Sequence, residues 1–253
     1  MTTTTIRREG RSLPSAVDER LVRRLARWFA LASVWVWLGF ALLAWGITRS
    51  NAATVGVTES VVGSLSVTPR NFLVGFAITV MVAWFVPLVA TGGTRRSYVT
   101  SAAIVVVLGA AAYAVLLTLA FRLEVGIYEA NGWPLVQRTG HLFSSGEQSG
   151  LVLAESFAVA AALALSGLAI GAGYRRLGGL RGTYALLVTA TPALVATAVL
   201  EVRASSGLGA ALGVRGLSAP ATVAVLAALA LVSLVTAYRL AHGAPARLVG
   251  TIR

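Results

Sequence analysis

The chain has 253 residues, of which 57% are hydrophobic and only 12% are charged, and its mean hydropathy is +0.81. Soluble domains contain about 45–50% apolar and about 25% charged residues, so this chain has too few charges to cover a water-facing surface. The composition therefore excludes an ordinary soluble domain and predicts that most of the exterior faces lipid. The absence of Cys excludes disulfides and thiolate metal sites.

The net charge of +12 arises from 21 basic residues, all of them Arg. A basic chain can bind nucleic acid, but here the Arg residues bracket apolar stretches, which is typical of topology signals in membrane proteins. We therefore expect a lipid bilayer around the chain and no nucleic-acid partner. The abundance of Ala, Gly, Leu and Val beside Arg is typical of a high-GC bacterial genome.

The N-terminal region divides into two segments. Residues 1–13 are polar and Thr-rich, which predicts a disordered cytoplasmic tail. Residues 14–27 predict an amphipathic helix that lies at the membrane interface, with Ser15 and Asp18 as a capping box. Its apolar residues recur at helical spacing, and the opposite face carries the residues expected to meet anionic lipid: Arg20, Arg23, Arg24 and Arg27.

Six stretches are apolar over the roughly 20 residues that a helix needs to cross a hydrocarbon core about 30 Å thick. They cover residues 28–48, 71–92, 98–121, 151–173, 182–202 and 218–239. The sequence therefore predicts an all-α polytopic membrane protein, with a six-helix transmembrane domain over 28–241 and a cytoplasmic tail over 242–253. Ser218 is expected to cap the last span, with Pro220 in its first turn.

The distribution of Arg predicts the orientation. With the N-terminus inside the cell, 15 of the 21 Arg residues lie in cytoplasmic segments and six lie outside. This asymmetry favours a cytoplasmic N-terminus and C-terminus in a bacterial inner (plasma) membrane.

The predicted spans contain few residues that could catalyse a reaction or bind a metal. The chain has no Walker A pattern, and its two His and nine acidic residues are scattered, so we expect no enzymatic activity of its own, no metal site and no cofactor. Glu155 lies about one turn inside the fourth span and needs a partner, for which Arg122 or Arg203 is available; a contact to a cation or substrate is the alternative.

Two small features suggest how the helices pack. Pro192 interrupts the fifth span, either as a kink in a helix that lines a path or as static packing. Gly167 and Gly171 form a pair of small residues that suits close helix contact, either within one subunit, which we favour, or between two subunits.

The loop after the second span reads Gly92-Gly93-Thr94-Arg95-Arg96-Ser97-Tyr98. It can be a simple positive-inside turn, or a compact knob whose Arg pair binds the carboxylates of a partner. Its Gly-x-Thr-Arg-Arg pattern followed by an aromatic resembles the membrane subunits of type-two ABC exporters, particularly small actinobacterial ones. The Arg-rich helix before the first span is similar to theirs, as are the segments 129–133, Glu-Ala-Asn-Gly-Trp, and 171–176, Gly-Ala-Gly-Tyr-Arg-Arg.

The resemblance implies a membrane-spanning subunit that forms a translocation path together with a second copy of itself or a related permease. It also implies a separate ABC ATPase subunit, which would bind ATP and Mg and dock against Gly93, Thr94, Arg95, Arg96 and Tyr98, with the interfacial helix adding to the contact. The alternative is a non-transporting membrane protein that acts as an assembly or regulatory partner of another membrane complex.

Overall fold

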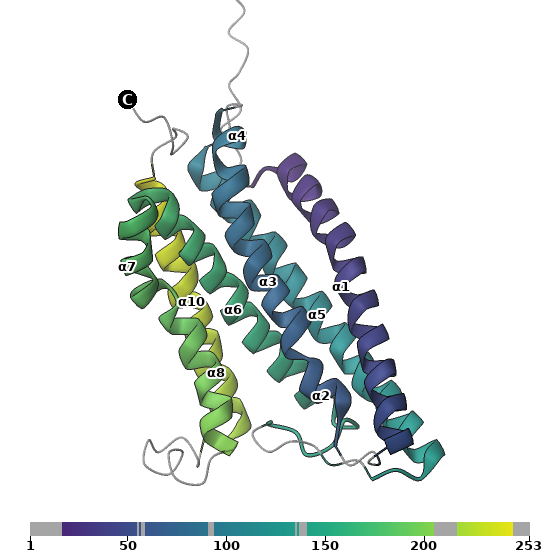
Figure 1. Ribbon diagram of the computed structural model, residues 1–253. Helices are drawn as coiled ribbons and strands as arrows, with labels where there is room; N and C mark the ends of the chain where they lie inside the picture. Colours follow the sequence, from purple (N-terminus) through teal and green to yellow (C-terminus); the bar gives the residue numbers. More distant parts are fainter. Residues whose placement is uncertain are drawn as a thin grey trace, which may run out of the picture.

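The computed structural model describes residues 17–54, 56, 59–90, 94–134, 136, 141–204 and 217–244, and for residues 201–204 the backbone alone. Within these ranges every regular element is helical, as the sequence predicts, and no strand is present. The elements are α1 (Glu19–Thr54), α2 (Val61–Leu65), α3 (Val67–Thr79), a π-helix η1 (Val80–Trp84), α4 (Phe85–Ala90), α5 (Arg95–Asn131), α6 (Ser149–Leu177), α7 (Gly179–Thr189), α8 (Thr191–Ala204) and α10 (Ala219–His242) (Figure 1).

Six helical stretches among the described residues are long and apolar enough to cross a membrane, so the six predicted spans are confirmed. The bounds differ most at two places: the second stretch begins at Val61 rather than at residue 71, and the third continues to Asn131 rather than ending at 121. The reason is Glu124, which looks like a loop residue in the sequence but is only 5% exposed. Its carboxylate accepts hydrogen bonds from the Ser60 hydroxyl at 2.6 Å and the Val62 amide at 2.9 Å, so the start of α2 docks on an extended α5.

The fourth span, α6, is the centre of the bundle. In its most apolar window 78% of the residues are buried, against 6% for α1. A Cβ added at Gly167 would lie 2.7 Å from the carbonyl oxygen of Val74 on α3, and one added at Gly171 would lie 2.6 Å from the Cβ of Met81. These distances are shorter than van der Waals contact, so only glycine permits the approach. The predicted close contact of this pair is confirmed, and it lies within the chain.

The first span extends beyond its predicted bounds of 28–48 at both ends. Helix α1 runs without a break from Glu19 to Thr54, so the segment 14–27 is not a separate interfacial helix where the structure describes it; it continues directly into the span. Asp18 caps this helix, because its Oδ1 accepts the amide of Leu21 at 3.2 Å. No Gly or Pro interrupts the chain between Glu19 and Leu38, which explains the continuity across residue 27.

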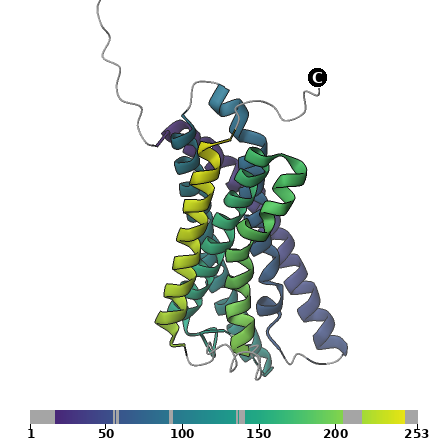
Figure 2. The ribbon, with the colours of Figure 1, turned by 90° about the vertical axis from the view of Figure 1, so that its left-hand side faces the viewer.

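Prolines interrupt two spans. Pro87 on α4 cannot donate a hydrogen bond to a preceding carbonyl, and the turn of π-helix η1 directly before α4 takes up the mismatch. In the fifth span the helix is broken at Ala190, two residues before Pro192, so the predicted interruption is confirmed. Figure 2 shows that α7 and α8 do not share one axis. The hydroxyl of Thr191 donates to the carbonyl of Leu187, which satisfies that carbonyl beside the break.

The two ends of the bundle differ in charge. The starts of α1 and α5, the turn α6–α7 and the end of α10 lie together at one end (Figure 1). We call this the basic end, since of the 13 Arg residues with described side chains it carries ten: Arg20, Arg23, Arg24, Arg27, Arg95, Arg96, Arg175, Arg176, Arg181 and Arg239. The far end carries Arg49, Arg70 and Arg122. At the far end Ser218 caps α10 as predicted, accepting the amide of Ala221 at 3.4 Å, with proline in the first turn.

Some predictions fall outside the described residues. They concern the disordered tail over 1–13, the contact role of Gly93 and, except for its first three residues, the tail over 242–253.

Candidate functional site

The turn after the second span opens α5 with a capped N-terminus. The Thr94 side chain accepts a hydrogen bond from the Ser97 amide at 3.1 Å, and the Thr94 backbone is extended at φ −79° and ψ 148°. Such a cap fixes the direction in which the chain enters the helix. The residues after Thr94 are therefore held in a defined orientation at the basic end.

The two Arg residues of this turn have different environments. Arg95 is half-buried, and its Nη1 donates to the carbonyl oxygen of His242 at 2.8 Å, which ties the turn to the end of α10. Arg96 is exposed, and the described residues give it no ion pair or hydrogen-bond partner. Arg96 is thus the member of the pair that is free to bind another molecule.

Tyr98 does not lie on a contact surface, which corrects the role that the family resemblance implied for it. Its side chain is only 2% exposed. The hydroxyl donates to the carbonyl of Val80, the first residue of η1, and the ring packs edge-on against Phe85 at a centroid distance of 5.2 Å. Tyr98 therefore connects the turn to the bundle interior.

A buried cation lies in the same region. Arg175 at the end of α6 is 6% exposed, and its guanidinium lies 5.9 Å from the ring centroid of Phe85. The aromatic face that Tyr98 contacts is thus also close to a positive charge from the central helix. From the sequence, Arg175 could not be distinguished from its exposed neighbour Arg176.

The start of α1 adds positive surface to the basic end. All four Arg residues predicted on its polar face are exposed, while Leu21 and Leu25 of its apolar face are buried. Arg24 lies over the Trp84 ring at 5.5 Å from its centroid, and Arg23 lies 3.6 Å from Glu19 in an exposed ion pair. Exposed ion pairs of this kind contribute little to stability, so these side chains remain available to anionic lipid or an acidic partner.

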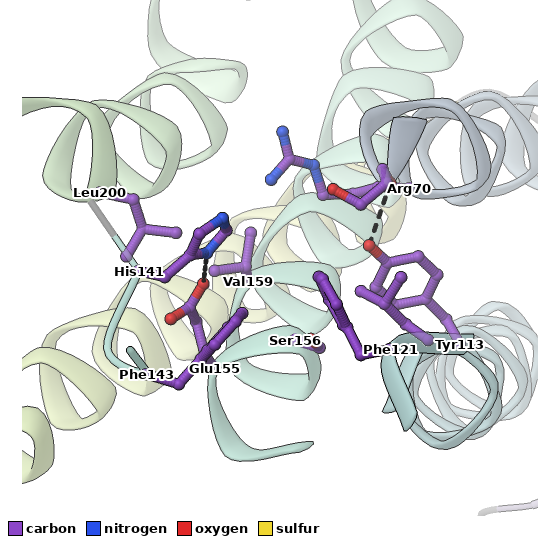
Figure 3. A pocket seen from close by; sticks show the side chains of 11 residues that line it. Arg70, Tyr113, Phe121, His141, Phe143, Glu155, Ser156, Val159 and Leu200 are labelled. Carbon is purple, nitrogen blue, oxygen red and sulfur yellow. Dashed lines mark hydrogen bonds and ion pairs between the residues drawn. The ribbon is translucent and has the colours of Figure 1, made fainter. Parts of the chain in front are cut away.

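A second cluster of polar groups lies toward the far end, around Glu155 (Figure 3). The Glu155 carboxylate is nearly buried at 4% exposure. One of its oxygens lies 2.7 Å from His141 Nδ1, and the other accepts the amide of Leu142. The predicted partner Arg122 instead donates to Ser149 at 2.7 Å. A hydrogen-bonding group from the preceding loop thus takes the place expected for Arg122, while the side chain of Arg203, the other predicted partner, lies outside the described residues.

The loop that carries His141 folds into the end of the bundle. The His141 ring stacks on Phe143 at a centroid distance of 4.6 Å, and Phe143 packs against Phe121 of α5. Phe143 is 4% exposed. The loop therefore closes the space between α5 and α6 at the far end.

Beside Glu155 is a cavity of about 20 Å³, which is room for one water molecule. Arg70 of α3 and Tyr113 of α5 also line it, as the labels in Figure 3 show. The Tyr113 hydroxyl donates to the carbonyl of Ser66, whereas the buried Nε of Arg70 has no hydrogen-bond partner among the described residues. The cavity has room for a water molecule that bridges Arg70 to its neighbours by hydrogen bonds.

The structure does not bring the predicted path residues together. Glu155 lines the cavity, but Pro192 does not; the residue of α8 that reaches the cavity is Leu200. Among the described residues no group of three His, Asp or Glu side chains could hold a metal ion.

Sequence reasoning identified Glu155 but missed His141 and Arg70 as its neighbours. The sequence did contain one signal, because a carboxylate inside an apolar span is costly unless a polar group lies close to it. His141, eight residues before the start of α6, was a candidate for that polar group.

Comparisons with protein-family models, curated proteins and solved structures found no match to this chain.

Proposed function

We propose that this chain is the membrane-spanning subunit of an ABC exporter, which forms a translocation path and couples to a separate ATPase subunit at the basic end. The observation that supports this most directly is the construction of the start of α5, from Thr94 to Tyr98. It presents the free Arg96 beyond a capped helix start, and Arg95 and Tyr98 bind it to two other parts of the bundle.

Those two connections supply what a coupling element needs. A displacement of the first turn of α5 is transmitted through Arg95 to the end of α10 and through Tyr98 to the π-helix η1. A segment without such packed contacts would absorb the same displacement. The start of α5 is therefore suited to carrying motion from a soluble partner into the spans.

The charge of the basic end suits an acidic partner surface. Eight of its ten described Arg residues are exposed, Arg95 and Arg175 being the exceptions, and Glu19 is the exposed acid beside them. Guanidinium groups bind carboxylates in a bidentate manner, which gives such a contact specificity as well as attraction. In the proposed complex the partner would hold ATP and Mg, and this chain would hold neither.

The orientation and assembly follow from the same proposal. The basic end faces the cytoplasm of a bacterial cell, as the excess of Arg favours. Because only 6% of the most apolar window of α1 is buried within the chain, this helix has a wide face free for a second copy or a related permease.

The proposal is tested by affinity purification of the full chain from its native membrane in a mild detergent. We expect an ATPase subunit to copurify and the complex to hydrolyse ATP with Mg. Arg96→Glu should weaken recovery of the ATPase about tenfold or more, since it places like charges across the contact, and Arg96→Lys should retain most of it.

A matched control is Arg181→Glu, which reverses an exposed charge at the same end but on α7. Equal losses with both reversals would show that general attraction, and not the turn, holds the partner. Recovery of no ATPase at all would contradict the transport function and favour the role of an assembly or regulatory partner.

A further inference from the structure

A hollow of about 630 Å³ runs along the side of the bundle between the later halves of α1 and α5. We call it the α1–α5 groove. Its walls are almost entirely apolar, and several wall residues are well exposed, such as Trp45 at 67% and Leu123 at 69%. Wall residues used below are Trp37, Ala44 and Trp45 from α1 and Leu119, Leu123 and Ile127 from α5.

The polar groups of the groove lie mostly at one end. Thr48 and Asn131 line this end, and each donates to a carbonyl of its own helix at 2.8 and 2.7 Å. Arg49 lies beside them, is exposed, and has no ion pair or hydrogen bond to any residue that the structure describes. Glu124 also lines the groove, but its carboxylate is bound by α2 and by Ser60. This polar end, which we call the mouth of the groove, therefore carries one unneutralised positive charge, that of Arg49.

The length of the groove matches one leaflet of a bilayer. From Trp37 to Arg49 the helix advances 12 residues, which is about 18 Å. One leaflet of hydrocarbon is about 15 Å deep. The charged mouth therefore lies at headgroup level when the opposite, aromatic end of the groove lies near the middle of the membrane.

The groove has room for the tails of one phospholipid. An extended hydrocarbon chain about 4–5 Å wide fills about 300 Å³ over about 18 Å. Two acyl chains therefore need about 600 Å³, which the groove provides.

From these observations we infer that the α1–α5 groove binds one phospholipid with an anionic headgroup, taken from the leaflet at the far end. Its acyl chains lie against Trp37 and the leucines of α5, and its phosphate binds Arg49. A zwitterionic lipid is disfavoured because its amine finds no free carboxylate in the groove. This site is independent of the proposed ATPase contact, which lies at the opposite end of the molecule.

The chain supplies matched reporters for a test. Trp37 lies in the groove with its ring 6.1 Å from Tyr113, whereas Trp35, two residues away, is 77% exposed. Full-length variants that retain only Trp37 or only Trp35, with Phe at the other Trp positions, are reconstituted in phosphatidylcholine vesicles. A fixed minor fraction of either phosphatidylglycerol or phosphatidylcholine carries brominated acyl chains, which quench nearby Trp fluorescence.

We expect brominated phosphatidylglycerol to occupy the site near Trp37 about fivefold more than brominated phosphatidylcholine, since one Arg at headgroup level contributes about that much. Trp35 should show no preference. Arg49→Gln should abolish the preference at Trp37, and Arg49→Lys should preserve it. Equal quenching of Trp37 by both lipids overturns the proposal, and so does Trp37 that neither lipid quenches, which would indicate coverage by protein.

Replacing five Trp residues can disturb folding, so a second measurement uses the chain with all its Trp residues. Native mass spectrometry should detect phosphatidylglycerol retained on this protein, and Arg49→Gln should lose most of it. Retention unchanged by Arg49→Gln contradicts the assignment of the phosphate to Arg49.

Discussion

The contact between α3 and α6 can be tested with a single methyl group. Gly167 on α6 faces the backbone of α3, and the Cβ of Gly167→Ala would lie 2.7 Å from the carbonyl oxygen of Val74 and 2.9 Å from the Cβ of Ala77. Neither atom can move aside by a side-chain rotation. The two helices must therefore separate by about 1 Å to restore normal contact.

The expected magnitude follows from two opposing effects. Overpacking of this kind costs about 1–3 kcal/mol, and the higher helix propensity of Ala offsets about 1 kcal/mol of that cost. Gly75 on α3 is the matched control, because a Cβ there meets no atom within 4 Å. Gly75→Ala retains the propensity gain without the clash. The two variants should thus differ by about 1–3 kcal/mol, with Gly167→Ala the less stable.

The assay is thermal unfolding in one detergent and lipid mixture, followed by the fluorescence of the six Trp residues. With about 2–4 °C per kcal/mol for a chain of this size, the midpoint of Gly167→Ala should lie about 2–12 °C below that of Gly75→Ala. If Gly167→Ala melts at or above the control, the close approach of α3 and α6 is wrong. Gly171→Ala, with its Cβ 2.6 Å from that of Met81, should behave like Gly167→Ala.

Three further experiments test individual polar contacts by the same unfolding assay. Glu155→Ala removes the acceptor of His141 and of a backbone amide and should cost about 1–3 kcal/mol; an unchanged midpoint would show that the far-end loop is not held there. Tyr98→Phe removes one buried hydrogen bond while keeping the ring contact, so we expect a loss of about 1 kcal/mol, and a larger loss would mean that the hydroxyl does more than bind one carbonyl. Ser166 and Ser233 lie 2.9 Å apart between α6 and α10, and a double-mutant cycle with Ala should give a coupling of about 0.6 kcal/mol; a coupling of zero would contradict this contact.

The sequence predicted the spans well because their signal is local. Crossing a membrane requires about 20 apolar residues in a row, and no tertiary contact is needed to recognise such a run. The same holds for the cap at Ser218 and the break before Pro192, which depend on near neighbours in the chain. The pair Gly167 and Gly171 was also recognisable, since small residues four apart form a stripe on one helix face.

Features that depend on distant residues could not be predicted in the same way. Glu124 is a helix residue only because the start of α2 supplies donors to its carboxylate from more than 60 positions away. Tyr98 carries no sequence sign that it points inward to Val80 rather than outward to a partner. Of the two Arg residues that charge favoured as partners of Glu155, Arg122 bonds elsewhere, because the fold of the loop brings His141 nearer to the carboxylate.

The unbroken first helix links membrane thickness to the protein surface beyond it. Helix α1 is 36 residues long, or about 54 Å, and a bilayer core is only about 30 Å thick. A thinner bilayer makes such a helix lean further. Because α1 is continuous from Glu19 onward, a change in its tilt also moves its first turns, and with them Arg20 and Arg24. The thickness of the bilayer thereby sets the position of the positive charges that lie beyond its hydrocarbon core.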